Sequence, residues 1–205
     1  IHQGLSDINQ PSWGSWSGRF SKEKIKNVPS RHASIKVDEV TYGDYYVYTE
    51  VSDAWKDQET NETYNSIYTP VWRWRQAYFN DFQARMDWCI LPFEKANHNP
   101  VAAINGDHSE KIHFLNTKAG ETVSLDASDS MDPDGDTLKY NWWVYPEVGT
   151  YKKGDVLIKN ASKPKLELSI PADAKGKTIH VILELKDENP IVSLTDYRRI
   201  VLTVN

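Results

Sequence analysis

Regular alternation of apolar and polar residues near the C-terminus constrains the fold of this chain more than any other feature. Within residues 177–187, four apolar side chains occupy every second position: Ile179, Val181, Leu183 and Leu185. Side chains two residues apart along a β-strand point to the same face, so this segment is expected to be a half-buried strand. Residues 200–204 repeat the pattern.

Other candidate strands precede these two, and turn residues separate them at short intervals. They cover residues 112–115, 122–126, 137–145 and 165–170. About 105 residues is the usual size of an antiparallel sandwich of seven such strands. Residues 98–205 are therefore expected to form an all-β sandwich.

The composition excludes several classes of protein. The chain has 205 residues, 39% of them hydrophobic, which is enough for packed cores. With 24 basic and 29 acidic residues the net charge is −5, so no basic surface is left over to bind nucleic acid. No stretch reaches the roughly 18 apolar residues that a membrane span needs. The single cysteine, Cys89, excludes an intrachain disulfide.

The aromatic residues divide the chain into two regions. Seventeen of the 24 lie in residues 1–97 and seven in residues 98–205. The segment between the regions is short and polar, and it ends in Pro100, which forces the preceding residue into an extended conformation. We therefore expect two domains, residues 1–97 and residues 98–205.

One helix is expected in the first region. Thr69 can cap it, and Pro70 occupies the first helical position, where its missing N–H costs nothing. Residues at spacings of three and four then define one face: Val71, Trp74, Tyr78, Phe82, Arg85, Met86 and Cys89. This pattern predicts an amphipathic helix of about twenty residues that ends near Pro92 and buries the Cys89 thiol.

Four aspartates around Gly135 allow two interpretations. Asp126, Asp132, Asp134 and Asp136 offer the oxygen ligands that calcium prefers, and they are the candidate metal ligands. The segment lacks the bidentate Glu of a calcium-binding helix–loop–helix. Asp, Pro and Gly also make turns between strands, and the turn is the favoured interpretation.

Trp142 and Trp143 are neighbours on a candidate strand, so their side chains must point to opposite faces. One of them is expected in the core. The other can stack on a sugar ring or cover a sheet edge, and packing is the favoured interpretation.

Several segments together resemble a family of bacterial secreted proteins, in which a nucleoside hydrolase-like domain precedes an immunoglobulin-like C-terminal domain. Some members are labelled cellulose-binding proteins. The resemblance lies in these segments: residues 4–7, 13–20, 79–89, 96–100, 125–128, 132–136, 142–151 and 179–184. It implies an α+β remnant of a nucleoside hydrolase-like α/β domain followed by an all-β immunoglobulin-like sandwich. The family's aspartate-rich signature is missing from this sequence. The resemblance therefore implies that the chain lacks the N-terminal half of its own first domain, which would be its partner.

The loop at residues 13–20 is a hallmark of that resemblance. Trp13, Trp16 and Arg19 sit among small residues, as binding residues on a loop do. With Asp7 they are the candidate substrate-binding residues, forming a pocket wall for a carbohydrate or nucleoside-like ligand. Alternatively, the two tryptophans pin the loop to the domain surface. Both interpretations stay open.

The resemblance implies the C-terminal portion of a secreted or periplasmic glycoside or nucleoside hydrolase-like protein of carbohydrate metabolism. No catalytic residue is assigned, and the chain alone is expected to be inactive, because it lacks the aspartates that would hold a metal and its attacking water. The rival hypothesis is a non-catalytic polysaccharide-binding (cellulose-binding) or cell-surface module.

Overall fold

A computed structural model describes residues 4–24, 46–57, 60–153 and 155–205. The chain divides into two compact units. Unit 1 comprises Ile1–Asp7 and Arg75–Asn205, and unit 2 comprises Ile8–Trp74. This division by contacts falls earlier than residue 97, and the division into domains at residue 97 stays a prediction.

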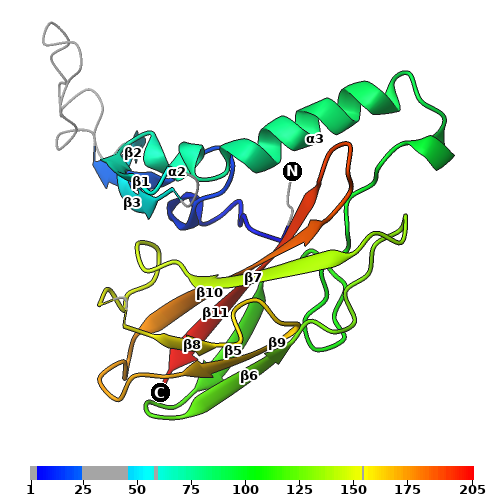
Figure 1. Cartoon of the computed structure of the whole chain (residues 1–205). Helices are drawn as coiled ribbons and strands as arrows, with labels where there is room; N and C mark the ends of the chain where they lie inside the picture. The colour runs from blue at the N-terminus through cyan, green and yellow to red at the C-terminus, as the bar shows by residue number, and fades with distance from the viewer. Residues whose placement is uncertain (1–3, 25–45, 58–59, 154) are drawn as a thin grey trace, which may run out of the picture. The chain divides into compact units, whose positions relative to one another are not determined.

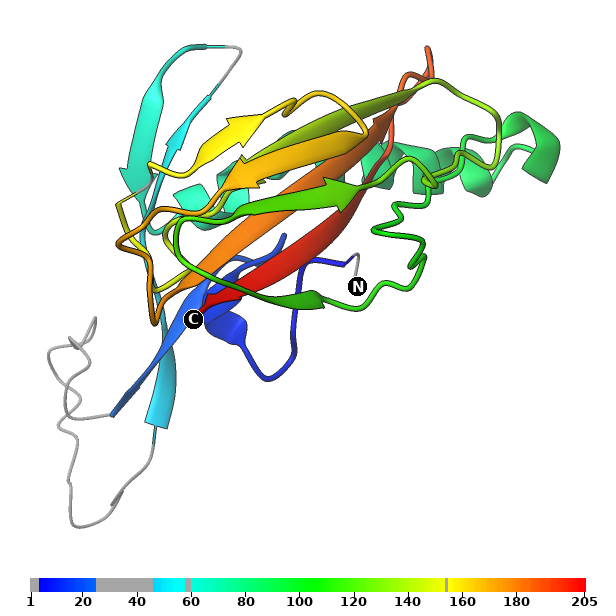
Figure 2. The ribbon, with the colours of Figure 1, turned by 90° about the horizontal axis from the view of Figure 1, so that it is seen from below.

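The strands of unit 1 form two sheets in adjacent layers (Figures 1 and 2). One sheet has the order β5-β11-β10-β7, in which only β5 and β11 pair in parallel, and the other has the order β6-β9-β8. Their bounds are β5 (His113–Thr117), β6 (Thr122–Asp126), β7 (Leu138–Val144), β8 (Leu157–Lys159), β9 (Lys165–Ser169), β10 (Thr178–Asp187) and β11 (Thr195–Val204). The strands expected in this region are confirmed, and β8 is an addition.

The core of unit 1 lies between these sheets. Leu125, Leu166 and Leu168 from the smaller sheet pack in one cluster with the alternating apolar residues of β10 and β11. Burial of these apolar side chains between the sheets stabilises the unit through the hydrophobic effect. The alternation in the sequence thus locates the core correctly.

The opposite face of β10 and β11 is also buried, next to the N-terminal segment. Arg199 donates its backbone N–H to Gly4 O (2.9 Å) and its Nε–H to Leu5 O (2.6 Å). Gly4 has φ = +63°, and a Cβ there would lie 1.9 Å from the carbonyl oxygen of Tyr197. Only glycine allows so close an approach to the strand.

Helix α3 (Arg75–Trp88) also belongs to unit 1 and contacts the rest of that unit through few residues. Ala84 contacts Val192 and Leu194 in a small cluster, and Asn80 donates a side-chain hydrogen bond to Ser193 O (2.7 Å). A short 3₁₀ helix, η3 (Phe93–Lys95), follows. No helix of the described residues is long and apolar enough to cross a membrane.

The described residues of unit 2 form two small antiparallel sheets and short helical turns. β1 pairs with β2, and β3 pairs with β4. The elements are η1 (Pro11–Trp13), β1 (Phe20–Lys24), β2 (Tyr46–Glu50), β3 (Asp53–Lys56), β4 (Thr63–Ser66) and α2 (Thr69–Trp72).

The expected fold class, an α+β remnant of a nucleoside hydrolase-like α/β domain followed by an immunoglobulin-like sandwich, is wrong. The described chain is mostly β and forms several small open sheets. A remnant of an α/β domain would require parallel strands joined by crossover helices. The described strands before residue 97 pair antiparallel within two-stranded sheets instead.

The expected twenty-residue helix is wrong in two respects. It is divided into α2 and α3, with Arg73 and Trp74 between them. Its apolar face also points outward, since Phe82 and Met86 are exposed, and Cys89 is an exposed free thiol rather than a packed one.

Candidate functional site

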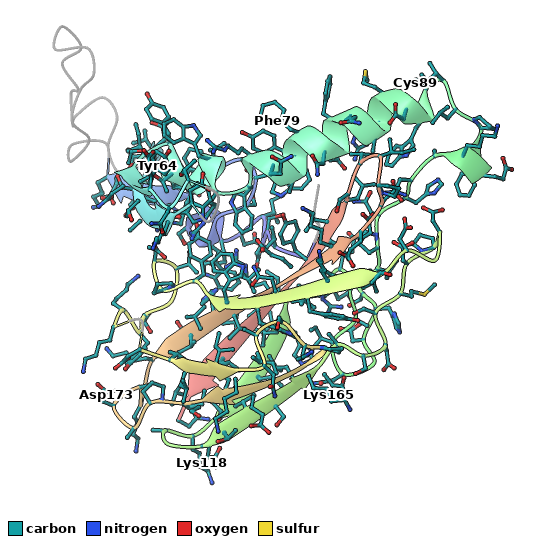
Figure 3. The ribbon with its side chains drawn as sticks, in the orientation of Figure 1. Tyr64, Phe79, Cys89, Lys118, Lys165 and Asp173 are labelled. Atoms are coloured by element: carbon teal, nitrogen blue, oxygen red, sulfur yellow. The ribbon has the colours of Figure 1, made fainter. Side chains whose placement is uncertain are left out.

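Four aromatic side chains of unit 2 form a partly exposed group, here called the aromatic cluster: Trp55, Tyr64, Tyr68 and Trp72. Figure 3 labels Tyr64 within the crowded side chains of unit 2. The rings of Trp55 and Tyr64 stack with centroids 6.0 Å apart, and those of Tyr68 and Trp72 with centroids 5.6 Å apart. Tyr64 meets Trp72 edge-on at 5.9 Å, so the two stacked pairs are continuous.

Local structure brings these rings together. Trp55 and Tyr64 are direct cross-strand partners in the β3–β4 register, and such aromatic pairs stabilise a two-stranded sheet. Tyr68 and Trp72 lie four residues apart at the two ends of α2, so they share one side of that turn. Thr69 and Pro70 of the same turn are buried.

A buried carboxylate holds α2 against β3. Asp53, whose side chain is fully buried, accepts a hydrogen bond from Arg19 Nε (2.7 Å) and pairs with Arg73 Nη1 (3.2 Å). Arg19 also donates to Ser52 O (2.9 Å). Because Arg73 follows Trp72 directly, this ion-paired group fixes the end of α2 that carries the exposed indole.

Polar groups surround the aromatic cluster. Tyr64 donates its hydroxyl hydrogen to Glu62 (2.7 Å), and this hydrogen bond raises the pKa of the phenol. Thr63 and Asn65, which alternate with Tyr64 along β4, are exposed. Flat apolar rings with hydrogen-bonding groups beside them match a sugar, which presents C–H groups on its faces and hydroxyls at its edges.

The candidate substrate-binding residues lie in both units. Asp7 belongs to unit 1, whereas Trp13, Trp16 and Arg19 belong to unit 2. Both tryptophans are half-buried, and Trp16 lies in a tight turn that two backbone hydrogen bonds between Ser15 and Gly18 close. The guanidinium of Arg19 contacts Asp53, as described above. A substrate-binding role for these four residues stays a prediction.

The tryptophan pair of β7 lies as expected. Trp142 is buried in the core of unit 1, and its Nε1–H donates to Lys163 O (2.9 Å). Trp143 is half-buried and packs against Tyr145 with ring centroids 5.2 Å apart.

Each of the four candidate metal ligands has protein partners. Asp126 contacts Lys165 (2.8 Å), which lowers the carboxyl pKa to about 2. Asp132 accepts two backbone N–H groups, and burial raises its pKa. Asp134 accepts from His98 N (2.7 Å), and Asp136 accepts from Asn189 Nδ2 (2.8 Å).

These contacts are typical of a turn rather than of metal coordination. Within the described ranges, no three His, Cys, Asp or Glu side chains form a group that could hold a metal ion. Calcium at Asp126, Asp132, Asp134 and Asp136 stays a prediction.

Sequence reasoning missed the aromatic cluster. The helical spacing places Val71 and Trp74 on the expected buried face, and it predicts no functional role for Trp72 or Tyr68. The one signal in the sequence was the Trp55 and Tyr64 pair, at equal distances from the ends of the polar segment 57–62. That symmetry is typical of a hairpin, but it does not place α2 beside the rings.

Comparison with known proteins gives two similarities, and no curated protein matches. Residues 122–204 match the family model of the C-terminal domain of cellulose-binding protein Sde0182. This matched region lies within unit 1 and does not include the aromatic cluster.

A solved structure matches nearly the whole chain. It is that of a hypothetical protein from Saccharophagus degradans, described as nucleoside hydrolase-related and associated with carbohydrate metabolism. The match has 40% sequence identity and a TM-score of 0.78, and it covers 99% of this chain. The chain spans 45% of the length of the S. degradans protein. Both units therefore have counterparts in one protein associated with carbohydrate metabolism.

Proposed function

We propose that this chain is a non-catalytic carbohydrate-binding part of a protein of carbohydrate metabolism, with a polysaccharide such as cellulose as its ligand. The exposed aromatic cluster carries the proposal. Trp72 and Tyr68 leave 38% and 56% of their surface exposed within one continuous group of rings, and a contiguous exposed apolar patch marks a binding site. The similarity of residues 122–204 to a cellulose-binding protein supports the same ligand class.

Retention on microcrystalline cellulose tests the proposal. We expect the wild-type chain to be depleted from solution by cellulose, and Trp72→Ala or Tyr68→Ala to weaken the affinity roughly tenfold, because each removes one stacking ring. Tyr68 is more than half exposed, so its variant should melt at nearly the wild-type temperature, whereas Trp72→Ala also loses the ring contacts with Tyr64 and Tyr68 and should melt at a lower temperature while remaining folded. Depletion isotherms give the affinity for cellulose, and thermal melts of the same samples give the melting temperature.

Tyr48→Ala is the matched control. Tyr48 lies on β2 of the same unit and is as exposed as Tyr68, at 57%. Its loss should leave retention unchanged. Two results would contradict the assigned site: unchanged retention in the Trp72→Ala and Tyr68→Ala variants, or retention lost only on Trp143→Ala, which would place binding within residues 122–204. Trp16→Ala tests the candidate loop separately.

A second candidate function is favoured by the S. degradans match. The chain would then be the C-terminal portion of a larger, secreted hydrolase-like protein, in which carbohydrate binding serves a hydrolase domain supplied by other residues. The two functions are compatible, because one concerns unit 2 and the other concerns what unit 1 contacts.

A further inference from the structure

Helix α3 and the segment after it carry a series of exposed apolar residues, here called the apolar stripe: Phe79, Phe82 and Met86 on α3, then Ile90, and Phe93 in η3. Their exposed fractions lie between 49% and 79%. At 100° per residue, Phe79, Phe82 and Met86 fall within an arc of about 60° of the helix. Figure 3 shows Phe79 and Cys89 on the side of α3 that faces away from the strands of unit 1.

The inward side of α3 is small and polar by comparison. Its buried residues are Asp81 and Ala84, roughly opposite the stripe, and Asp81 pairs with Arg85 (2.6 Å). Trp88 packs partly against the same cluster as Ala84, whereas Phe79, Phe82 and Met86 lie in solvent. A surface of several adjacent exposed phenylalanines and aliphatic residues marks a contact with another protein surface.

We infer that the apolar stripe is the docking surface for a nucleoside hydrolase-related domain. The chain matches only 45% of the S. degradans protein, although 99% of the chain takes part in that match. More than half of that relative therefore lies outside the matched region. This part either packs against the matched region or makes no contact with it. The stripe supplies the largest sequence-local group of exposed apolar residues in the described chain. This inference rests on the second candidate function and is independent of cellulose retention.

The test pairs the chain with the unmatched part of the S. degradans protein, co-expressed as a separate chain. Affinity purification through a tag on the chain described here should recover both. We expect the double variant Phe82→Ser/Met86→Ser to recover at least tenfold less of the partner. Its melting temperature should stay near the wild-type value, because both side chains are already in solvent.

Phe114→Ser is the matched control, since Phe114 on β5 of the same unit is 61% exposed, like Phe82. It should leave recovery unchanged. Absence of the partner from the wild-type purification, or equal loss with Phe114→Ser, would overturn the inference. Sedimentation equilibrium of the chain alone gives a further test. A wild-type dimer that the double variant converts to a monomer would show that a second copy covers the stripe, and it would overturn the inference. Cellulose retention by that variant separates this failure from failure of the carbohydrate site.

Discussion

His180 is a buried histidine that the interior keeps neutral. It is 2% exposed on β10, and Arg199 Nη1 lies 3.2 Å from its Nδ1, which therefore accepts a hydrogen bond. Burial, with the positive charge of Arg199, lowers the pKa of His180 to about 3. The folded chain thus excludes a proton that the unfolded chain binds below about pH 6.5.

This difference makes the folded state sensitive to acid. As the pH falls from 6.5 toward 3, the unfolded chain gains a proton at His180 while the folded chain does not, so stability falls. Between pH 7 and pH 5 the loss from this residue is about 2 kcal/mol. His180→Gln, whose amide oxygen can still accept from Arg199, should lose about that much less stability over the same range. Urea titrations of both proteins at the two pH values measure the difference.

Asp196 has the opposite effect on the pH dependence of stability. Burial raises its pKa to about 6, so this residue makes the folded state more stable as the pH falls toward 4. It is present in both proteins, and its effect cancels in their comparison. Equal pH dependence of wild type and His180→Gln would mean that His180 is protonated in the folded chain.

At the scale of elements, the ion-paired Asp53 sets the position of α2. Asp53→Asn keeps the shape of the side chain but removes the carboxylate that pairs with Arg19 and Arg73, whose side chains are only 12% and 8% exposed. Removing one partner of a buried pair costs about 3 kcal/mol, so we expect a corresponding fall in the free energy of unfolding. Cellulose retention should fall with it.

The control for this change is Asp173→Asn, which removes an exposed ion pair with Lys153. Such pairs contribute about 1 kcal/mol or less. Urea unfolding followed by tryptophan fluorescence compares the two variants. Equal stability of Asp53→Asn and wild type would show that the two arginines find other partners and that Asp53 does not hold α2.

Some helices and strands can be predicted from their own sequences, and others cannot. β6, β9 and β10 were predicted closely, because a period of two with one apolar face fits a strand and no other element. The α3 segment has helical spacing, but spacing alone does not say which side faces inward. That side is set by residues more than a hundred positions later: Val192 and Leu194 pack against Ala84, and Ser193 accepts a hydrogen bond from Asn80. The aromatic cluster depends on contacts between β3, β4 and α2 that no single periodicity contains.

The division of the whole molecule can be tested by proteolysis. Lys95 is exposed, but the segment after it is held in place: Trp88 Nε1 donates to Asn97 O (2.7 Å), and Asn97 Nδ2 donates to Asp187 and to Val192 O (both 2.8 Å). Proteases cleave backbone that can leave its contacts. Limited trypsin digestion should therefore leave α3 joined to the strands, as a stable fragment beginning near Arg75.

Mass spectrometry of the first stable fragments identifies their ends. A fragment that begins at Ala96 and appears before any cut within residues 8–74 would instead favour the domain division at residue 97. Digestion in the presence of cellulose adds a second comparison, since a bound ligand on unit 2 should slow cuts there and leave unit 1 unaffected.

The chain leaves unit 1 at residue 7 and returns to it at residue 75, so unit 2 is connected at both of its ends. A mechanical pull on unit 2, such as drag from a bound polymer, is therefore divided between two covalent connections. One of them is secured by Gly4 and Leu5 hydrogen-bonded to Arg199, and the other by Asn80 hydrogen-bonded to Ser193. The force then acts on unit 1 at two points, rather than pulling a single terminus away from its sheet.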